Sequence, residues 1–463
     1  MTRHAFLLAI LAALSALAMA QQSPSAVALP SAPGPNLNAA LQATVSPDAN
    51  GTSAQVQSLT RAQAEQMAIQ NNPRITAAKL LALAQHEVVR EARSADLPMT
   101  YGQISAVDAK DASRLSAGSL NSSRLLTHAG AGGGFTQLIT DFGRTHNLVL
   151  SRKLAEESSR ADALATTEDV VLAADEAFYD ALTAQAVLRV AVQTIHTRQA
   201  TQTQISQLTS NKLRSTLDLS FANVNLSQAK LLKLDAQNNA DAAMAALDEI
   251  LGLDRQVTYQ LIDDDGPLPT LPSDVEEVVG RALQQRPDLQ ARNLDQQSAQ
   301  KYARAERQQM LPSISAAGTL GAVPIRTDQY YNSNWWGAVG VNVEIPIFNG
   351  FLYSAQAKEA GYRANVAAEN ARDLRDRIVR DVRTAWLNAN TAYQRVGVTA
   401  ELAKEADLGL TLAQTRYSLG LSSIVELSQA QLQQTGAEID NTNAQYQYRL
   451  DLAALNYQTG TAP

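Results

Sequence analysis

The chain has 463 residues, of which 45% are hydrophobic, 18% charged and only 5% aromatic, with a net charge of −7 and no cysteine. These values exclude disulfides and thiolate metal sites, and they argue against a nucleic-acid partner, because the chain has no surplus of basic side chains for phosphates. Much of the apolar fraction is alanine, which packs helices closely but builds a poor globular core, so long helices are favoured over a thick globule.

Residues 1–20 predict a secretory signal peptide. Arg3 and His4 precede an apolar run, and Ala18-Met-Ala20 has the form of a cleavage site. A membrane anchor is the weaker alternative, because this run and every later one are shorter than the roughly 20 residues that a spanning helix needs. Residues 21–58 are rich in Pro, Ser and Ala without apolar periodicity, and they predict a flexible N-terminal segment.

Residues 59–252 and 275–460 are predicted to be two copies of one structural repeat, joined by a turn-rich linker at 253–274. The two copies align without a gap over their second parts. Corresponding positions include Leu97-Pro98 and Leu311-Pro312, Phe178 and Trp386, Leu219 and Leu427, and Gly252 and Gly460. A chance match of this extent is improbable, so an internal duplication is predicted.

Each copy is predicted to hold two shorter helices, a strand hairpin, one very long helix and a returning helix. In the first copy these elements are 59–71, 73–95, the hairpin 97–142, 144–210, and a helix ending at 251. In the second copy they are 275–285, 287–310, the hairpin 311–349, 351–418 and 424–457. A helix of about 67 residues is roughly 100 Å long, which no globule can contain. Its apolar residues recur three and four positions apart, which predicts coiled-coil packing in a curved wall, with a soluble antiparallel rod as the alternative.

Residues 338–348, AVGVNVEIPIF, alternate between apolar residues and small or polar ones. This pattern predicts a strand with one apolar face and one wet face. The four strand candidates are 99–107, 130–142, 313–322 and 337–348. Strands of about 10 residues have the length that crosses a bilayer obliquely, whereas a half-buried sheet in a soluble protein is the alternative.

The predicted membrane strand carries its own candidate residues. Those predicted to face lipid are Val339, Val341, Val343 and Ile345. Those predicted to form interfacial aromatic belts are Tyr330, Tyr331, Trp335 and Trp336 at one end, and Phe348, Phe351 and Tyr353 at the other. Four strands cannot close a barrel, and open sheet edges are excluded from hydrocarbon, so the chain must assemble with copies of itself, two giving eight strands and three giving twelve.

Short motifs around the predicted hairpins and turns carry a family resemblance. They are Leu97-Pro98 and Leu311-Pro312 before the hairpins, Asp141-Phe-Gly-Arg144 and Phe348-Asn-Gly350 after them, and Arg416-Tyr-Ser-Leu-Gly-Leu421 at the second helical turn. In this order and spacing they resemble the TolC-type outer-membrane efflux protein family, over about residues 59–460. The resemblance implies a mainly α fold with a small β part, in which a duplicated coiled-coil tube joins a trimeric twelve-stranded transmembrane β-barrel.

The same resemblance implies a location, a function and partners. The location is the outer membrane of a Gram-negative bacterium, with a long periplasmic extension. The function is that of a passive exit duct for a tripartite efflux pump or a type I secretion system. The chain would form a homotrimer, and its partners would be a periplasmic adaptor and an inner-membrane transporter of the RND or ABC type.

The resemblance also assigns roles to the turns between the long and the returning helices, which would form the periplasmic mouth. The implied adaptor contacts are Lys212, Leu213, Leu419, Gly420 and Leu421, and the implied gate and selectivity residues are Asp218, Glu426 and Tyr417. Ser422 stands where the family has an arginine, and Gln429 stands where it has a second acid. A closed state with fewer ionic links, helped by Arg214 or Arg416, is therefore expected.

No enzyme, cofactor or metal site is predicted. The five histidines are scattered without ligand spacing, and Gly130-Ala-Gly-Gly-Gly-Phe135 lacks the last glycine of a dinucleotide loop. Asp263-Asp-Asp-Gly266 lacks the acidic residue that a calcium loop requires. The competing interpretation of the whole chain is a secreted coiled-coil structural or adhesive protein.

Overall fold

The computed structural model describes residues 57–108, 114–117, 120–124, 128–253, 259–263, 266–326 and 335–460. All of them belong to one unit, Val56–Pro463. The predicted signal peptide and nearly all of the predicted flexible segment lie outside the described residues, as do Tyr330 and Tyr331 of the predicted aromatic belt.

The described helices form two sets of matching length. The first set is α2 (Arg61–Asn71, 11 residues), α3 (Pro73–Ser94, 22 residues), α4 (Arg144–Ser210, 67 residues) and α5 (Thr216–Ile250, 35 residues). The second set is α6 (Val275–Gln285, 11 residues), α7 (Pro287–Gln308, 22 residues), α8 (Leu352–Ser418, 67 residues) and α9 (Ile424–Thr459, 36 residues). Three pairs are equal in length and the fourth differs by one residue, which fits an internal duplication. None of the helices described is both long enough and apolar enough to cross a membrane.

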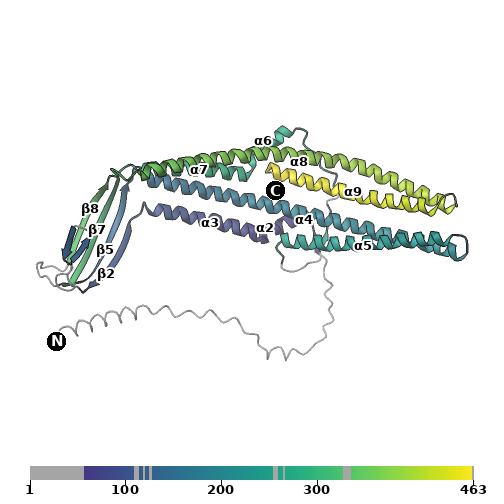
Figure 1. Ribbon diagram of the computed structural model, residues 1–463, viewed down its shortest axis with the longest axis horizontal. Coiled ribbons are helices and arrows are strands. Elements are labelled where there is room, and N and C mark those ends of the chain that lie inside the picture. Colours follow the sequence, from purple (N-terminus) through teal and green to yellow (C-terminus); the bar gives the residue numbers. More distant parts are fainter. Residues whose placement is uncertain are drawn as a thin grey trace, which may run out of the picture. The chain divides into compact units, whose positions relative to one another are not determined.

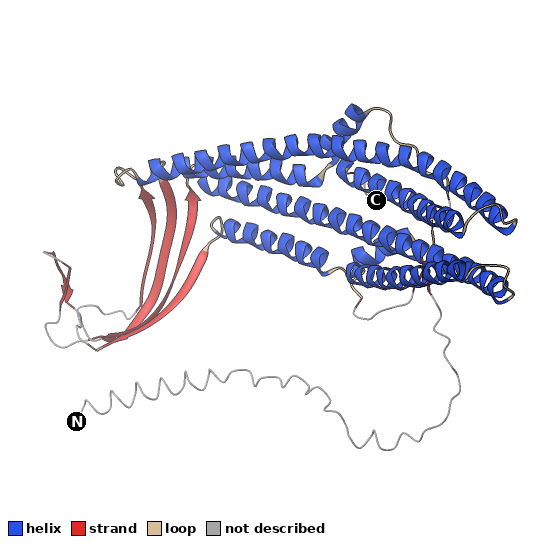
Figure 2. Ribbon diagram, turned by 45° about the vertical axis from the view of Figure 1, so that its right-hand side comes forward, coloured by secondary structure: helices blue, strands red, loops and turns tan. Residues whose placement is uncertain are grey.

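Two long helical hairpins dominate the arrangement (Figures 1 and 2). The helix α4 returns as α5, and α8 returns as α9, while the shorter α3 and α7 pack along the halves of α4 and α8 that lie nearer the strands. Buried residues form separate clusters along the length instead of one centre: one around α2, α4 and α5, one around α6, α8 and α9, and one near the turns. This distribution agrees with the alanine-rich coiled-coil pattern of the sequence.

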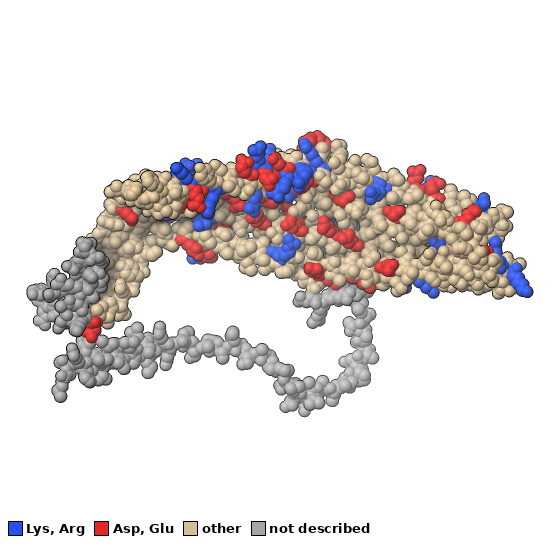
Figure 3. All heavy atoms as spheres, in the orientation of Figure 1, with Lys and Arg blue, Asp and Glu red and all other residues tan. Residues whose placement is uncertain are grey.

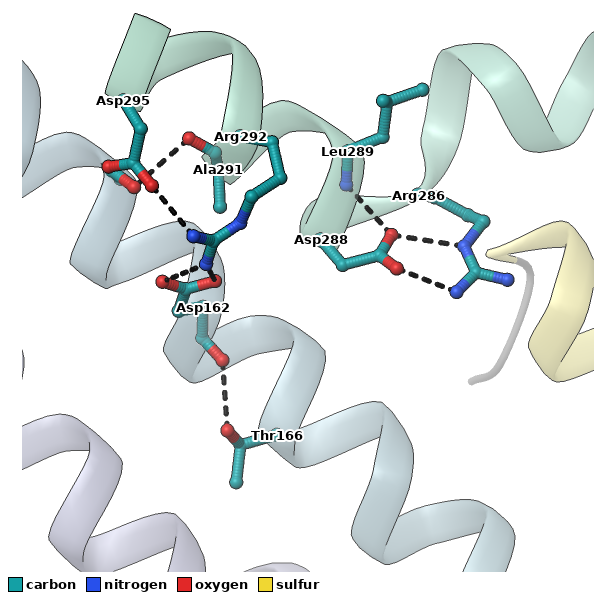
Figure 4. Close-up of polar contacts among 9 residues, drawn as sticks. Asp162, Thr166, Arg286, Asp288, Leu289, Ala291, Arg292 and Asp295 are labelled. Atoms are coloured by element: carbon teal, nitrogen blue, oxygen red, sulfur yellow. Dashed lines mark hydrogen bonds and ion pairs between the residues drawn. The ribbon is translucent and has the colours of Figure 1, made fainter. Parts of the chain in front are cut away.

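The helices α3 and α7 both begin at a proline but are capped differently. The Asn72 side chain caps α3 by accepting a backbone N–H two residues on, at 3.0 Å. Arg286 precedes α7, and its side chain has no oxygen that could cap the helix. The Asp288 carboxylate instead accepts the N–H of Leu289 at 2.8 Å and pairs with Arg286 at 2.7 Å (Figure 4). The acid at this helix N-terminus also suits the helix dipole.

The contact between α4 and α7 includes a charged bridge (Figure 4). The Arg292 guanidinium of α7 lies 2.8 Å from Asp162 of α4 and 2.8 Å from Asp295 of its own helix. Both pairs are about half exposed, so each contributes only roughly 0.2–1 kcal/mol. One turn away, the Ser158 hydroxyl donates to the Ala291 carbonyl at 3.0 Å, where close helix approach is permitted by the small side chains.

Each long helix begins after two consecutive residues with positive φ. These are Phe142 (φ 56°) and Gly143 (φ 94°) before α4, and Gly350 (φ 64°) and Phe351 (φ 66°) before α8. A phenylalanine in this region costs roughly 1–2 kcal/mol. In the first copy Asp141 holds the turn, because its carboxylate accepts the backbone N–H of Gly143 at 3.1 Å and that of Thr145 at 2.7 Å.

Two short strands lie at the predicted domain boundaries. The strand β1 (Gln57–Leu59) pairs in parallel with β6 (Tyr259–Leu261). The first residues of β1 were expected in the flexible segment, and β6 was expected to be linker. Three-residue strands are too short for a period to be recognised, and what holds them is tertiary: Leu59 is 2% exposed and packs against the core around α2 and α4.

Four strands form one antiparallel sheet in the order β2-β5-β7-β8. They are β2 (Met99–Val107), β5 (His128–Thr140), β7 (Ser313–Arg326) and β8 (Trp335–Glu344). Each predicted hairpin is present, and β5 pairs with β7 to join the two hairpins. The Ser-rich segment expected to be a loop contains a further hairpin, β3 (Arg114–Ala117) with β4 (Leu120–Arg124).

Candidate functional site

The two faces of the four-stranded sheet differ in polarity. Val339, Val341 and Val343 of β8 are 80%, 66% and 51% exposed, and the register places Ile314, Leu320 and Phe135 on the same face. We call this the valine face. The opposite, polar face carries Gln103, Ser105, Thr136, Ser313, Ser315, Thr319, Asn342 and Glu344. A row of exposed aliphatic side chains is costly in water, so the valine face requires an apolar environment.

Ile345 does not belong to the strand that carries the valine face. The strand β8 ends at Glu344, one residue before it, and Pro346 follows. Proline has no N–H for a strand ladder, which explains why the alternating pattern continues in sequence while the strand stops.

The aromatic residues at the far end of β8 lie on both faces. Trp335 is on the valine face, whereas Trp336 pairs with Gly321 on the polar face. A Cβ on Gly321 would lie 2.8 Å from the Trp336 ring, so the glycine is what allows the indole to lie flat on the sheet. The aromatic belt stays a prediction at this end of the strand, and its two tryptophans lie on opposite faces of the sheet. At the other end, Phe348 and Phe351 are exposed and stack edge to face at 5.6 Å.

Charged side chains are concentrated on the helices (Figure 3). The face shown carries acidic and basic groups along α8 and its neighbours, while the described part of the sheet is almost free of them. Both outer strands of the sheet, β2 and β8, have one neighbour only among the described strands. Open edges beside an uncharged apolar face are typical of a sheet that continues into another copy.

The turns at the opposite ends of the long helices share one geometry, although their sequences differ. One residue in each turn has the left-handed helical (αL) backbone conformation, namely Lys212 (φ 61°) in the first turn and Gly420 (φ 75°) in the second. In each, the following leucine N–H closes a six-residue loop at 2.8 Å, from Leu213 to the Leu208 carbonyl and from Leu421 to the Arg416 carbonyl. The departure from glycine at Lys212 therefore leaves the turn unchanged. The apolar tips Leu213, Leu419 and Leu421 are all strongly exposed.

The αL lysine predicts a measurable strain in the first turn. Lys212→Gly is expected to stabilise that turn by up to about 1 kcal/mol, because glycine adopts positive φ without a Cβ clash. The matched change Gly420→Ala is expected to destabilise the second turn by about 1 kcal/mol. Amide hydrogen exchange at the two turns measures both effects, and equal exchange rates in Lys212→Gly and the unaltered chain would contradict the strain.

A polar link connects the two hairpins beside these turns. The Tyr417 hydroxyl lies 3.4 Å from the Asp218 carboxylate, and the Arg214 guanidinium lies over the Tyr417 ring at 4.3 Å and donates to its carbonyl. Burial and the neighbouring Asp218 raise the pKa of Tyr417, so its hydroxyl remains a donor. Arg416 instead pairs with Glu426 within one hairpin, at 3.1 Å. Of the two arginines expected to help, Arg214 makes the link between hairpins.

Several charged clusters were not found from the sequence. Arg61 contacts the buried carboxylates of Glu65 at 2.6 Å and Asp175 at 3.1 Å. Burial raises the pKa of Asp175 to about 7, and the neighbouring Glu65 adds to this effect, while Arg61 opposes it. Burial likewise raises the pKa of Glu168 to about 7, in spite of Arg286. Within the described ranges, no group of three or more His, Asp or Glu side chains could hold a metal ion.

Comparison with known proteins defines what this architecture is. Residues 278–461 match the family model described as outer membrane efflux protein. The outer membrane protein TolC of Escherichia coli (strain K12) is 23% identical over 426 residues, which are 86% of this chain and 82% of that protein. TolC of Salmonella enteritidis is 25% identical over 181 residues, 37% of each chain. The solved structure of CusC matches with a TM-score of 0.76 at 18% identity, over 86% of this chain and 92% of that one.

The fold is therefore that of the channel-tunnel proteins, in which strand hairpins and long helical hairpins alternate. Residues 278–461 belong to the outer membrane efflux protein family, and most of the chain is similar to the TolC proteins of Escherichia coli and Vibrio cholerae. The chain is accordingly an efflux channel protein of the outer membrane of Gram-negative bacteria and not an enzyme, as the resemblance implied.

Proposed function

We propose that three copies of the chain form one exit duct, which serves a tripartite efflux pump or a type I secretion system. The observation that carries this proposal is the four-stranded sheet, which combines an exposed valine face with two edges that pair with no other described strand. In hydrocarbon such a sheet must close with other copies, and a twelve-stranded barrel leaves a water-filled interior lined by the polar face.

The first test is of assembly and conduction together. The protein extracted in detergent is expected to have the mass of a trimer, and the same preparation is expected to give steady ion conductance in a planar lipid bilayer. Extraction without detergent as a water-soluble monomer would support the secreted coiled-coil alternative and reject the duct.

The helix tips are the surface that we propose for the periplasmic adaptor. The exposed Leu213, Leu419 and Leu421 flank two turns of equal geometry, so they offer similar apolar contacts on both hairpins. Exposed apolar residues surrounded by a charged rim are typical of a protein-binding surface. An inner-membrane transporter of the RND or ABC type would energise transport through the same assembly.

Asp218 and Glu426 are the residues that we propose for cation selection at the mouth. Each lies in the first turn of a returning helix, where the helix dipole also favours an acid. In a trimer they would repeat as rings, which concentrate cations and repel anions. The link from Arg214 through Tyr417 to Asp218 would hold the mouth closed.

The double variant Asp218→Ala with Glu426→Ala is expected to lose cation preference in single-channel recordings. The reversal potential in a salt gradient measures this preference, and a shift toward zero is expected because the fixed negative charge is gone. The control is Asp241→Asn, which removes an exposed acid of α5 remote from the turn. An unchanged reversal potential in the double variant would reject the two rings as the selectivity element.

A further inference from the structure

Arg198 of α4 is a buried cation at the contact with α9. Its side chain is 8% exposed. The guanidinium donates to the side-chain amide oxygen of Gln431 and lies 3.5 Å from the Thr435 hydroxyl, both on α9. Gln431 in turn donates to Thr201, one turn further along α4, at 3.4 Å. All of these partners are neutral, so they solvate the charge without compensating it.

No carboxylate of the described residues pairs with Arg198. It is absent from every ion pair that the described part of the chain forms, whereas Arg61, Arg286 and Arg449, which are also partly buried, each have an acid beside them. Burial alone lowers the pKa of Arg198 to about 10. A buried charge without a counter-ion costs several kcal/mol, so an arginine at this position is expected to have an anion that the chain itself does not supply.

Arg198 also lines a cavity of about 410 Å³ between α5 and α9. The walls combine polar side chains with apolar ones. The polar residues are Thr194, Asn225, Gln228, Ser428, Gln429 and Thr435, and the apolar residues are Phe221, Ala229, Leu232, Val425 and Leu432. Arg198 is the one charged residue among those lining it. Gln228 of α5 is exposed at the rim, so the cavity is reached from the surface. Asn225 and Ser428 are joined by a hydrogen bond of 2.7 Å, which fixes one polar wall.

We propose that this cavity is a binding site for a small monovalent anion, such as chloride or acetate, held by Arg198. A single guanidinium neutralises one negative charge. The Thr194 and Thr435 hydroxyls donate to carbonyls of their own helices, so the remaining hydrogen bonds would come from the Gln228 amide and the Ser428 hydroxyl. A divalent anion would leave one charge uncompensated in the same environment. The bound anion would stabilise the contact between α4, α5 and α9. This inference does not depend on which pump the duct serves.

The test measures the thermal unfolding midpoint of the detergent-extracted trimer while chloride replaces isethionate, a larger anion, at constant ionic strength. The unfolding midpoint of the unaltered protein is expected to rise by roughly a few degrees as chloride is added. Once the chloride concentration exceeds Kd, the midpoint is expected to rise with its logarithm. The line width of the ³⁵Cl resonance gives direct evidence of binding, and acetate is expected to narrow it by competition.

Three variants separate the charge from the hydrogen bonds. Arg198→Gln keeps a donor toward Gln431 but removes the charge, so the midpoint is expected to become independent of chloride. Thr435→Glu places a carboxylate next to the guanidinium, and it is expected to raise the midpoint at low chloride and to abolish the response. Arg189→Gln removes an exposed cation from the same helix and is the control that should respond like the unaltered protein.

Two results would overturn the site. One is an unaltered protein whose midpoint and ³⁵Cl line width do not respond to chloride. The other is a chloride response that persists in both Arg198→Gln and Thr435→Glu, since the anion would then bind elsewhere. In either case Arg198 would serve only as a hydrogen-bonding contact between α4 and α9.

Discussion

Val341→Arg is expected to prevent assembly of the membrane-inserted trimer. Val341 is central in β8 and exposed on the valine face, so the new charge would lie in hydrocarbon in every copy. An arginine near the middle of a membrane strand costs roughly 2–4 kcal/mol per chain, so about 6–12 kcal/mol for three copies, which is comparable to the total stability of many proteins. The yield of heat-resistant trimer on a gel and the fraction inserted into vesicles measure the effect.

Asn342→Arg is the matched control for this prediction. It adds the same charge one residue away, but on the polar face, so insertion is expected to be unchanged within about 1 kcal/mol while ion selectivity shifts toward anions. Equal loss of trimer in both variants would mean that the two faces do not differ in their surroundings. Normal insertion of Val341→Arg would show that the valine face is not in lipid.

Asp175→Asn is expected to stabilise the helical body above neutral pH. Asp175 is 4% exposed and shares the buried cluster of Arg61 and Glu65. Its pKa is raised from 3.8 to about 7, so ionisation opposes folding. Ionising the buried carboxyl therefore costs the folded state on the order of 2–4 kcal/mol of stability. The amide of Asn does not ionise, so the variant does not lose this stability when the pH rises.

The direction with pH follows from the raised pKa. The folded chain holds the Asp175 proton more tightly than the unfolded chain, so this contribution to stability is complete below about pH 4 and is lost as the pH rises through about 7. Chemical denaturation between pH 4 and 8 is expected to show a smaller decline in Asp175→Asn than in the unaltered protein. Part of the decline in stability is expected to remain in the variant, because the pKa of Glu168 is also raised to about 7.

Asp241→Asn serves as the control in this experiment too, since Asp241 is an exposed carboxylate of α5. It is expected to follow the unaltered protein at every pH. A decline that is equally steep in Asp175→Asn would show that the carboxyl of residue 175 ionises normally in the folded chain.

The long helices could be predicted from the sequence almost to the residue. The helix α4 has the predicted limits, and α8 begins one residue later than expected. Their apolar periodicity extends over many turns, and each is preceded by a glycine turn, so local signals agree with the tertiary structure. The valine face could be predicted for the same reason, because alternation over Val339, Val341 and Val343 is a signal of period two.

Features set by contacts between distant residues could not be predicted. Nothing local distinguishes Arg198 from a solvated arginine on a helix surface, because its burial depends on where α9 lies. The same applies to Asp175, whose partner Arg61 is more than 100 positions earlier. The pairing of β5 with β7 depends on the register between the two copies, which a single hairpin sequence does not contain.

The parallel pairing of β1 with β6 has a consequence for the timing of biogenesis. Gln57 pairs with Tyr259, so a chain exported amino end first presents β1 long before its partner has arrived. Closing so distant a pair requires most of the first copy to be ordered in between, which makes this small ladder one of the last contacts of the first copy to form. Until then Leu59 stays accessible, and in a chain truncated before β6 this leucine would remain exposed to periplasmic proteases.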